Sequence, residues 1–166
     1  EARIKEDYEA FRARNYRLPL AMDIRIDPKA PKTFDVGEEE RRRKYERCWE
    51  RGGMALLLAY RDSSVNAEAN ETISQFIRGK ISEVVDDPAV AQLLMPNHIY
   101  ACKRPCLDTN YFETFNRSNV TLVDVSKTGI TAITRNGVLV GNDEHDLDCI
   151  VLATGFDAMT GALNRI

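Results

Sequence analysis

The sequence predicts an α+β fold, in which a helical N-terminal part is followed by a β-rich C-terminal part. Apolar residues recur at steps of three and four between residues 69 and 85, which is typical of a long helix. After Asn119 β-branched residues alternate with polar ones, and Asn136-Gly137 is a strong hairpin signal. Residues 149–153 form an apolar run typical of a strand buried on both faces.

The helical part also shows capping signals. The motif Asp35-Val-Gly-Glu38 has the spacing of a capping box, which predicts a helix start there. Asp87 followed by Pro88 predicts another start, because Asp caps helices and proline suits their first turn. We expect helices over Ile4–Tyr16, from the capping box at 35–38 to Gly52, over 69–85, from Pro88 to Met95, and a short aromatic helix around Tyr111, Phe112 and Phe115 that is capped by Asp108 or Asn110.

The C-terminal part reads as short strands. Asn136-Gly137 should join two of them, because both residues tolerate the positive φ that a tight turn requires. Residues 143–146 are acidic and read as a turn. Strands are expected over 98–101, 120–125, 130–134, 138–140 and 149–153.

The composition argues against nucleic-acid binding, membrane binding and secretion. The 166 residues include 23 Lys and Arg against 26 Asp and Glu, and the net charge of −3 argues against general nucleic-acid or anionic-membrane binding. No apolar run approaches the roughly 20 residues that cross a bilayer. The N-terminal sequence lacks the apolar core of a signal peptide. We therefore expect a cytoplasmic protein without a nucleic-acid or membrane partner.

Cysteine and histidine positions do not suggest a metal site. The four cysteines are scattered without zinc-ligand spacing, and His98 and His145 are far apart in the sequence. We expect no bound metal and reduced, mostly buried thiols.

Two short segments have residues suited to binding. Lys103-Arg104 follows a predicted strand and precedes Pro105, so the pair is placed to present positive charge to an anionic ligand. Surface Lys-Arg pairs without a ligand are also common. Thr154-Gly155 ends the last predicted strand, where small residues allow a backbone or flat ligand to approach. It reads equally well as a simple strand terminator.

Four motifs in a fixed order give a more specific indication. They are Cys102-Lys-Arg-Pro105, Tyr111-Phe-Glu-Thr-Phe-Asn-Arg117, Asn119-Val120 and Ala153-Thr-Gly-Phe-Asp-Ala-Met-Thr-Gly161. In this order and spacing they resemble the Baeyer–Villiger monooxygenases of the cyclohexanone and related cyclic-ketone type. Members of this family are flavoproteins that use FAD, NADPH and O₂ to insert one oxygen atom next to a ketone carbonyl, which gives an ester or lactone.

The resemblance implies an α/β parent protein with two dinucleotide-binding domains and a helical insertion. By this comparison, residues 1–96 are the helical insertion of the NADP domain, residues 97–118 its returning strand with the active-site Lys-Arg segment, and residues 119–166 the second part of the FAD-binding domain. No glycine-rich phosphate loop is present, and the sequence does not begin with Met. We expect an internal segment that is inactive alone and able to self-associate through exposed strands.

The resemblance also implies residue roles. Arg104 aligns with the catalytic arginine beside the flavin ring, and Lys103 aligns with a basic residue that recognises the 2′-phosphate of NADP. Thr154, Gly155 and Asp157 fall in the loop where the two cofactor domains join, and are candidate cofactor contacts. A small-molecule ketone is the implied substrate.

Two other interpretations remain. The chain is also consistent with a non-catalytic helical and β module that serves interaction or stability. A related flavin monooxygenase that oxidises nitrogen or sulfur would carry similar motifs.

Overall fold

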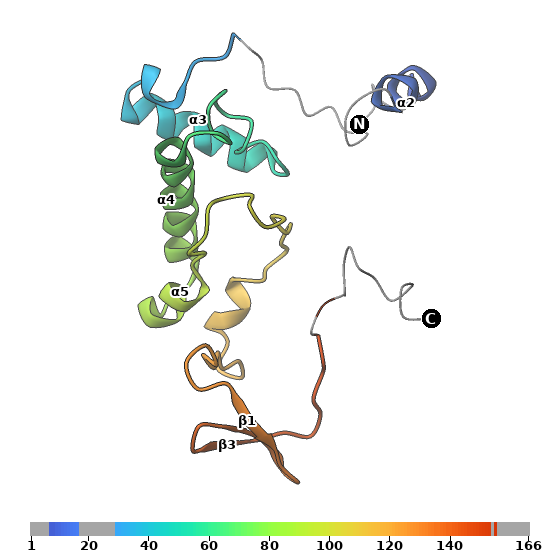
Figure 1. Ribbon diagram of the computed structural model, residues 1–166, viewed down its shortest axis with the longest axis vertical. Helices are drawn as coiled ribbons and strands as arrows, with labels where there is room; N and C mark the ends of the chain where they lie inside the picture. Colours follow the sequence, from blue (N-terminus) through green and yellow to red (C-terminus); the bar gives the residue numbers. More distant parts are fainter. Residues whose placement is uncertain (1–6, 17–28, 154, 156–166) are drawn as a thin grey trace. The chain divides into compact units, whose positions relative to one another are not determined.

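The computed structural model describes residues 7–16, 29–153 and 155 (Figure 1). Contacts divide the chain into two compact units, residues 1–121 and residues 122–166. The described part of the first unit contains helices, and that of the second contains a three-stranded antiparallel sheet. The α+β class predicted for this chain is therefore confirmed.

The helical unit contains every α-helix that the sequence predicts. Within the described residues its elements are α2 (Tyr8–Tyr16), η2 (Thr33–Asp35), α3 (Glu38–Arg51), α4 (Ala67–Val84), α5 (Pro88–Leu94) and η3 (Glu113–Asn116). The predicted start of the first helix, at Ile4, lies outside the described residues. The predicted aromatic helix is the short 3₁₀ helix η3, and Asp108 accepts a 2.8 Å hydrogen bond from the Tyr111 amide just before it.

The helix α3 begins at Glu38, two residues later than a capping box with Asp35 as N-cap predicts. Its N-cap is Gly37, and no side chain caps it. The Asp35 carboxylate instead accepts a 2.9 Å hydrogen bond from the Lys32 amide, which closes η2. The predicted capping box is wrong because the Asp35 side chain is used one turn earlier. At the other end, Gly52 adopts φ 72° and donates its amide to the last carbonyls of α3.

The two remaining helix starts have side-chain caps. Asn66 Oδ1 accepts from the amides of Glu68 and Ala69 at the start of α4, at 2.9 and 3.2 Å. Asp87 Oδ1 accepts a 2.8 Å hydrogen bond from the Ala89 amide, and proline occupies the first turn of α5. The Asp-Pro start predicted from the sequence is confirmed.

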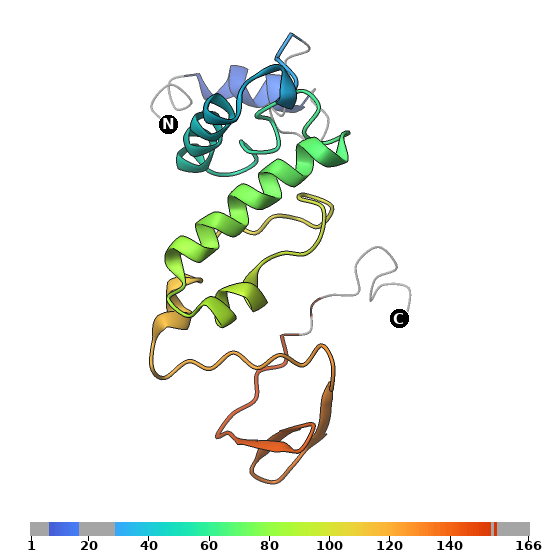
Figure 2. The same ribbon diagram turned by 90° about the vertical axis from the view of Figure 1, so that its left-hand side faces the viewer.

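The helical unit has two apolar clusters. One contains the buried residues Tyr45, Leu56, Ala59, Tyr60 and Ile73, and the other contains Ile81, Val85 and Ala91. In the first cluster the Tyr45 ring lies 5.9 Å from the Tyr60 ring and 5.6 Å from the Phe76 ring. Because α4 contributes to both clusters, it links α3 with α5, and Figure 2 shows it running between them.

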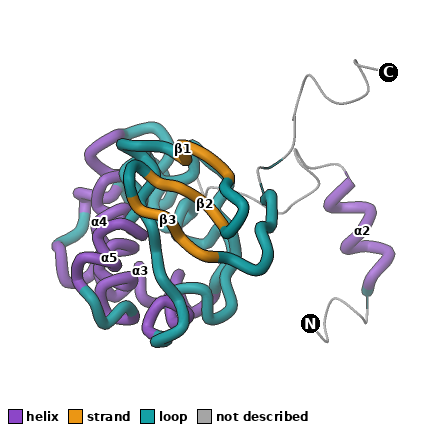
Figure 3. The backbone as a smooth tube through the Cα atoms, turned by 90° about the horizontal axis from the view of Figure 1, so that it is seen from below, coloured by secondary structure: helices purple, strands orange, loops and turns teal. Residues whose placement is uncertain are grey.

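The sheet consists of β1 (Ile130–Ile133), β2 (Gly137–Val140) and β3 (Asp143–Asp146), in that order and antiparallel (Figure 3). The hairpin predicted around Asn136-Gly137 is confirmed. The acidic turn predicted at 143–146 is wrong, because these residues form β3. Gly141, with φ 61°, makes the tight turn that returns the chain along β2.

Three other predicted strands do not form. Residues 98–101 are turns, and residues 120–125 and 149–153 have no regular secondary structure. Val151 and Leu152 are 83% and 76% exposed, so the segment predicted to be buried is open to solvent. A strand of a parallel sheet needs neighbours on each side to pair its backbone, and the described part of this chain supplies none there.

The prediction that the thiols are mostly buried is wrong. All four cysteines are free, but only Cys48 is partly buried, while Cys102, Cys106 and Cys149 are exposed. None of the helices in the described ranges is both long and apolar enough to cross a membrane.

Candidate functional site

Lys103 and Arg104, the two predicted site cations, lie between α5 and η3 in the helical unit. We call residues 95–112 the Lys-Arg loop. It contains no helix or strand, and the side chains of both cations are exposed. Neither forms an ion pair with another residue that the structure describes. Their charge is therefore open to a ligand from solvent.

The loop is attached to α4 by Asn70. This side chain is only 4% exposed. Its Oδ1 accepts a 2.8 Å hydrogen bond from the Tyr100 amide, and its Nδ2 donates to the Tyr100 carbonyl at 3.2 Å. The same Nδ2 donates to the Ser63 carbonyl at 3.0 Å. Asn70 thus satisfies both backbone groups of Tyr100, as a neighbouring strand would.

The attachment point, Tyr100, lies within a tight turn that runs from Ile99 to Cys102. The Cys102 amide donates to the Ile99 carbonyl at 3.1 Å, and Ala101 inside the turn has φ 66°. A positive φ is uncommon for a residue with a Cβ, so the surrounding contacts hold the turn in this conformation. Lys103 is the first residue after this turn, and it lies three residues after Tyr100, whose backbone Asn70 holds.

Further contacts fix both ends of the loop. Arg78 Nε on α4 donates to the Pro96 carbonyl at 3.1 Å, and its guanidinium pairs with Glu71 at 2.8 Å. At the far end, Asn116 Nδ2 donates to the Val84 carbonyl at 2.7 Å, while its Oδ1 accepts from the Asp86 amide at 2.9 Å. The Lys-Arg loop is thus held against α4 at both ends, and this return along α4 is visible in Figures 1 and 2.

Apolar contacts support the same two ends. Tyr100 packs against the first core cluster, and burial raises the pKa of its hydroxyl. Phe112 packs against the second cluster, and Tyr111 lies with its ring 5.3 Å from those of Phe112 and Phe115. The three aromatic residues of the predicted short helix therefore pack on one another and, through Phe112, on the core. This packing anchors the loop where the polar contacts of Asn116 also act.

The remaining predicted site residues belong to the second unit. Gly155 has φ 85°, a conformation that favours glycine, and no atom of the described residues lies within 4 Å of the position a Cβ would take. Its surroundings are open, as a close-approach turn requires. Thr154 and Asp157 lie outside the described residues.

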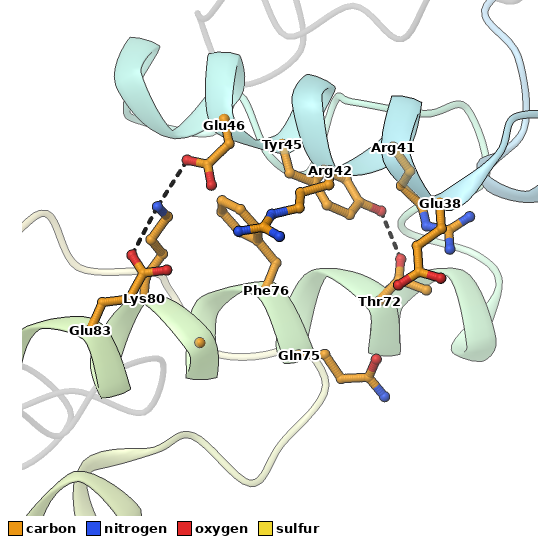
Figure 4. A pocket seen from close by; sticks show the side chains of 11 residues that line it. Glu38, Arg41, Arg42, Tyr45, Glu46, Thr72, Gln75, Phe76, Lys80 and Glu83 are labelled. Carbon is orange, nitrogen blue, oxygen red and sulfur yellow. Dashed lines mark hydrogen bonds and ion pairs between the residues drawn. The ribbon is translucent and has the colours of Figure 1, made fainter.

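A groove of about 270 Å³ lies elsewhere on the helical unit, between α3 and α4 (Figure 4). Lys80 bridges Glu46 and Glu83 across it at 2.9 and 3.1 Å, and the hydrogen bond to Glu46 raises the pKa of Lys80. The Tyr45 hydroxyl and Thr72 Oγ1 lie 2.7 Å apart at its other end. These paired groups join the two helices. The groove does not include Lys103 or Arg104 among its lining residues.

Sequence reasoning missed the residues that position the loop. Asn70 follows the core residue Ala69 directly and precedes Ile73 by three, so helical spacing places it beside the buried face of α4. A polar residue at such a position needs hydrogen-bond partners. The sequence therefore indicates that Asn70 needs hydrogen-bond partners, but it does not indicate that Tyr100 is one of them.

Comparison with known proteins gives close relatives. The chain is 40% identical over 167 aligned residues to cyclohexanone 1,2-monooxygenase from Acinetobacter sp., an alignment that covers 99% of this chain and 30% of that protein. It is 44% identical over 126 residues to a Baeyer–Villiger monooxygenase from Pseudooceanicola batsensis, covering 74% of this chain and 23% of that protein. Phenazine N-monooxygenase PhzNO1 from Lysobacter antibioticus is 42% identical over 136 residues, covering 80% of this chain and 25% of that protein.

Solved structures agree with these sequence matches. The crystal structure of OTEMO in complex with FAD and NADP matches with a TM-score of 0.91 and 36% identity, over 99% of this chain and 31% of that one. No family model matches the sequence. The chain spans less than a third of the length of the first curated relatives it matches. Over nearly its whole length, this chain therefore corresponds to a segment of the Baeyer–Villiger monooxygenases, the family that its motifs resemble.

Proposed function

We propose that this chain forms part of an FAD- and NADPH-dependent monooxygenase that inserts one oxygen atom of O₂ next to a ketone carbonyl, giving an ester or lactone. The alignment to a cyclohexanone monooxygenase over 99% of the chain is the observation that supports this most directly. The parent protein is then an α/β enzyme with two dinucleotide-binding domains. Residues 1–96 form the helical insertion of its NADP domain, 97–118 the returning segment with the site cations, and 119–166 the second part of its FAD domain.

Lys103 recognises the cofactor phosphate in this proposal. Its ammonium is exposed and lacks a described ion-pair partner, so it is able to bind the 2′-phosphate that distinguishes NADP from NAD. The Asn70 contacts with Tyr100 restrict where the backbone before Lys103 lies. A phosphate contact from a restricted backbone loses less entropy on binding than one from a mobile chain.

Arg104 is the catalytic residue in this proposal. The bound flavin supplies reduction of O₂, and the guanidinium stabilises negative charge that develops on oxygen as the ketone carbonyl is attacked. A guanidinium suits this role because it keeps its proton near neutral pH and offers several hydrogen-bond donors. Gly155, with its open surroundings, together with Thr154 and Asp157, is assigned to the loop that joins the cofactor domains.

The test uses the full-length protein that carries this segment. Purified with FAD and supplied with NADPH, cyclohexanone and ¹⁸O₂, it should form a lactone that contains one ¹⁸O atom, as measured by mass spectrometry. Absence of labelled ester or lactone from cyclic and linear ketones would overturn the proposal. The 166-residue chain alone, supplied with FAD, should show no ketone-dependent NADPH consumption.

Oxidation at nitrogen is the second candidate, because the phenazine N-monooxygenase matches this chain at 42% identity. The same full-length protein supplied with phenazine distinguishes the two. An N-oxide product without any lactone from ketones would favour this second function.

A further inference from the structure

We propose that Asn70 is a positioning residue for cofactor recognition, which acts by fixing the direction in which Lys103 and Arg104 leave the helical core. This inference rests on the proposed function. Asn70 itself does not contact a cofactor or substrate in the proposal. It acts through the backbone of Tyr100, to which it donates and from which it accepts.

The hydrogen-bond pattern requires an amide at this position. Tyr100 presents an N–H and a carbonyl to the same side chain, and Ser63 presents a second carbonyl. Among the side chains of this size, only Asn offers both an acceptor and two donor hydrogens. Asp would accept from the Tyr100 amide but would place a carboxylate oxygen against two carbonyl oxygens.

Because Asn70 is buried, losing its hydrogen-bond partners costs more than it would at the surface. Asn70 is 4% exposed, so water does not readily replace a lost partner. The backbone of the loop has no ladder or helix to hold it, since residues 95–112 contain neither. Its N-terminal half is held by Asn70 and by the Arg78 contact with the Pro96 carbonyl.

The position of the contact explains why it affects the cations. Tyr100 is the second residue of the turn closed by the Cys102 amide and the Ile99 carbonyl, and Lys103 follows that turn directly. Inside the turn Ala101 holds φ 66°, which is unfavourable without support from its surroundings. Release of Tyr100 would let Ala101 relax to negative φ and redirect the chain that carries Lys103 and Arg104.

The test compares cofactor preference in the full-length protein. We expect Asn70→Asp to lower the ratio of kcat/KM for NADPH to that for NADH by about tenfold or more, the size of effect that loss of a charge-assisted phosphate contact produces. The ratio is independent of how much protein is folded, because unfolded molecules use neither cofactor. A purely structural role for Asn70 therefore leaves the ratio unchanged.

Asn66→Asp is the matched control, because it makes the same chemical change on the same helix. Asn66 is exposed and its Oδ1 only accepts, a role that Asp fills equally well. The control should keep the wild-type ratio. If Asn70→Asp does not fold, Asn70→Ala carries the test, since it removes the contacts without burying a charge.

Lys103→Ala distinguishes a failure of the positioning proposal from a failure of the proposed function on which it rests. If Lys103→Ala lowers the cofactor preference while Asn70→Asp and Asn70→Ala leave it unchanged, the positioning proposal is overturned and the proposed function stands. If Lys103→Ala itself leaves the preference unchanged, the cofactor role assigned to the loop fails, and the positioning proposal fails with it.

Discussion

Arg104 has no ion-pair partner among the described residues, so the donors of its guanidinium are available to a ligand. The same is true of the ammonium of Lys103. Their sequence neighbours Cys102 and Cys106 are also exposed. At the scale of single residues, the loop therefore offers two charges whose position depends on backbone contacts made elsewhere, at Tyr100 and Asn116.

The first prediction concerns Lys103. In the full-length protein, Lys103→Ala should raise the KM for NADPH by roughly 10- to 100-fold, because a hydrogen bond to a charged group is worth about 1.5–3 kcal/mol. The KM for NADH should stay within a factor of about two, since that cofactor lacks the 2′-phosphate. Steady-state kinetics with both cofactors measures this. Lys127→Ala, which removes an exposed lysine of the second unit, serves as control.

A second residue-scale prediction concerns Tyr60. Its hydroxyl is buried without a hydrogen-bond partner among the described residues, and burial raises its pKa from 10.0 to about 12. The folded state thus keeps this proton longer than the unfolded state. Below pH 10 both states keep the proton, and the free energy of unfolding does not depend on the titration of Tyr60. Between pH 10 and about 12 only the unfolded state loses it, so the free energy of unfolding falls as the pH rises.

Tyr60→Phe should therefore reduce the loss of stability between pH 10 and 12. At pH 7 it should be neutral or stabilise the chain by about 1 kcal/mol, because it removes an unsatisfied buried group. Chemical denaturation at pH 7, 10 and 11.5 measures both effects. An unchanged alkaline loss would show that Tyr60 is not its source. A clear destabilisation at pH 7 would show that the hydroxyl has a hydrogen-bond partner in solution.

The sequence singles out the two candidate site cations, Lys103 and Arg104, but not the residues that hold their loop. Lys103 and Arg104 stand out because a charged pair followed by proline forms a recognisable motif. Asn70 does not, because its partner Tyr100 is 30 residues away and no local pattern connects them. Helical spacing indicates only that Asn70 lies beside a buried face, since long-range pairing is decided by tertiary packing.

At the scale of elements, the hairpin of β1 and β2 forms as predicted, but not through the positive φ angles on which the prediction relied. Asn136 and Gly137 were expected to need positive φ, yet neither has it. Thr134 Oγ1 instead closes the turn by accepting from both amides, at 3.2 and 3.0 Å. Glycine is required because a Cβ at 137 would overlap the backbone carbonyl of His145 on β3.

This gives a third prediction, in which one substitution has opposite effects at two glycines. Gly137→Ala should destabilise the sheet by about 1–3 kcal/mol through overlap with β3. Gly79→Ala should stabilise α4 by about 0.5–1 kcal/mol, because no atom of the residues that the structure describes lies within 4 Å of the new Cβ and alanine favours helices. Hydrogen exchange of each unit measures the two effects separately. A stable sheet in Gly137→Ala would contradict the packing of β2 against β3.

Helices were predicted better than strands, and the physical reason is locality. The stripe of α4 and the Asp87-Pro88 start involve residues within one or two turns of each other. A strand at 149–153 requires partners from elsewhere, and the described residues contain no neighbour for it. Its apolar sequence still indicates burial, which is consistent with neighbours contributed by another part of a longer protein.

At the scale of the whole molecule, this exposed segment leads to a fourth prediction. Val151 and Leu152 are 83% and 76% exposed, and exposed apolar segments with unpaired backbone groups associate with one another. The 166-residue chain should therefore self-associate at micromolar concentration in sedimentation velocity experiments, and Val151→Lys should weaken the association. Val65→Lys is the control, because Val65 is also 83% exposed but lies in the helical unit. Equal effects of the two substitutions would point to a different contact surface.

In the proposed function, Arg104 acts in ketone oxidation by a flavin- and NADPH-dependent enzyme. The most direct measurement is the rate of lactone formation by the full-length protein with Arg104→Ala, compared with wild type at equal flavin content. Loss of a pre-organised donor to developing oxyanion charge should lower kcat by about 10²- to 10³-fold. A folded Arg104→Ala enzyme that forms lactone at the wild-type rate would contradict the account and favour a non-catalytic role for this segment.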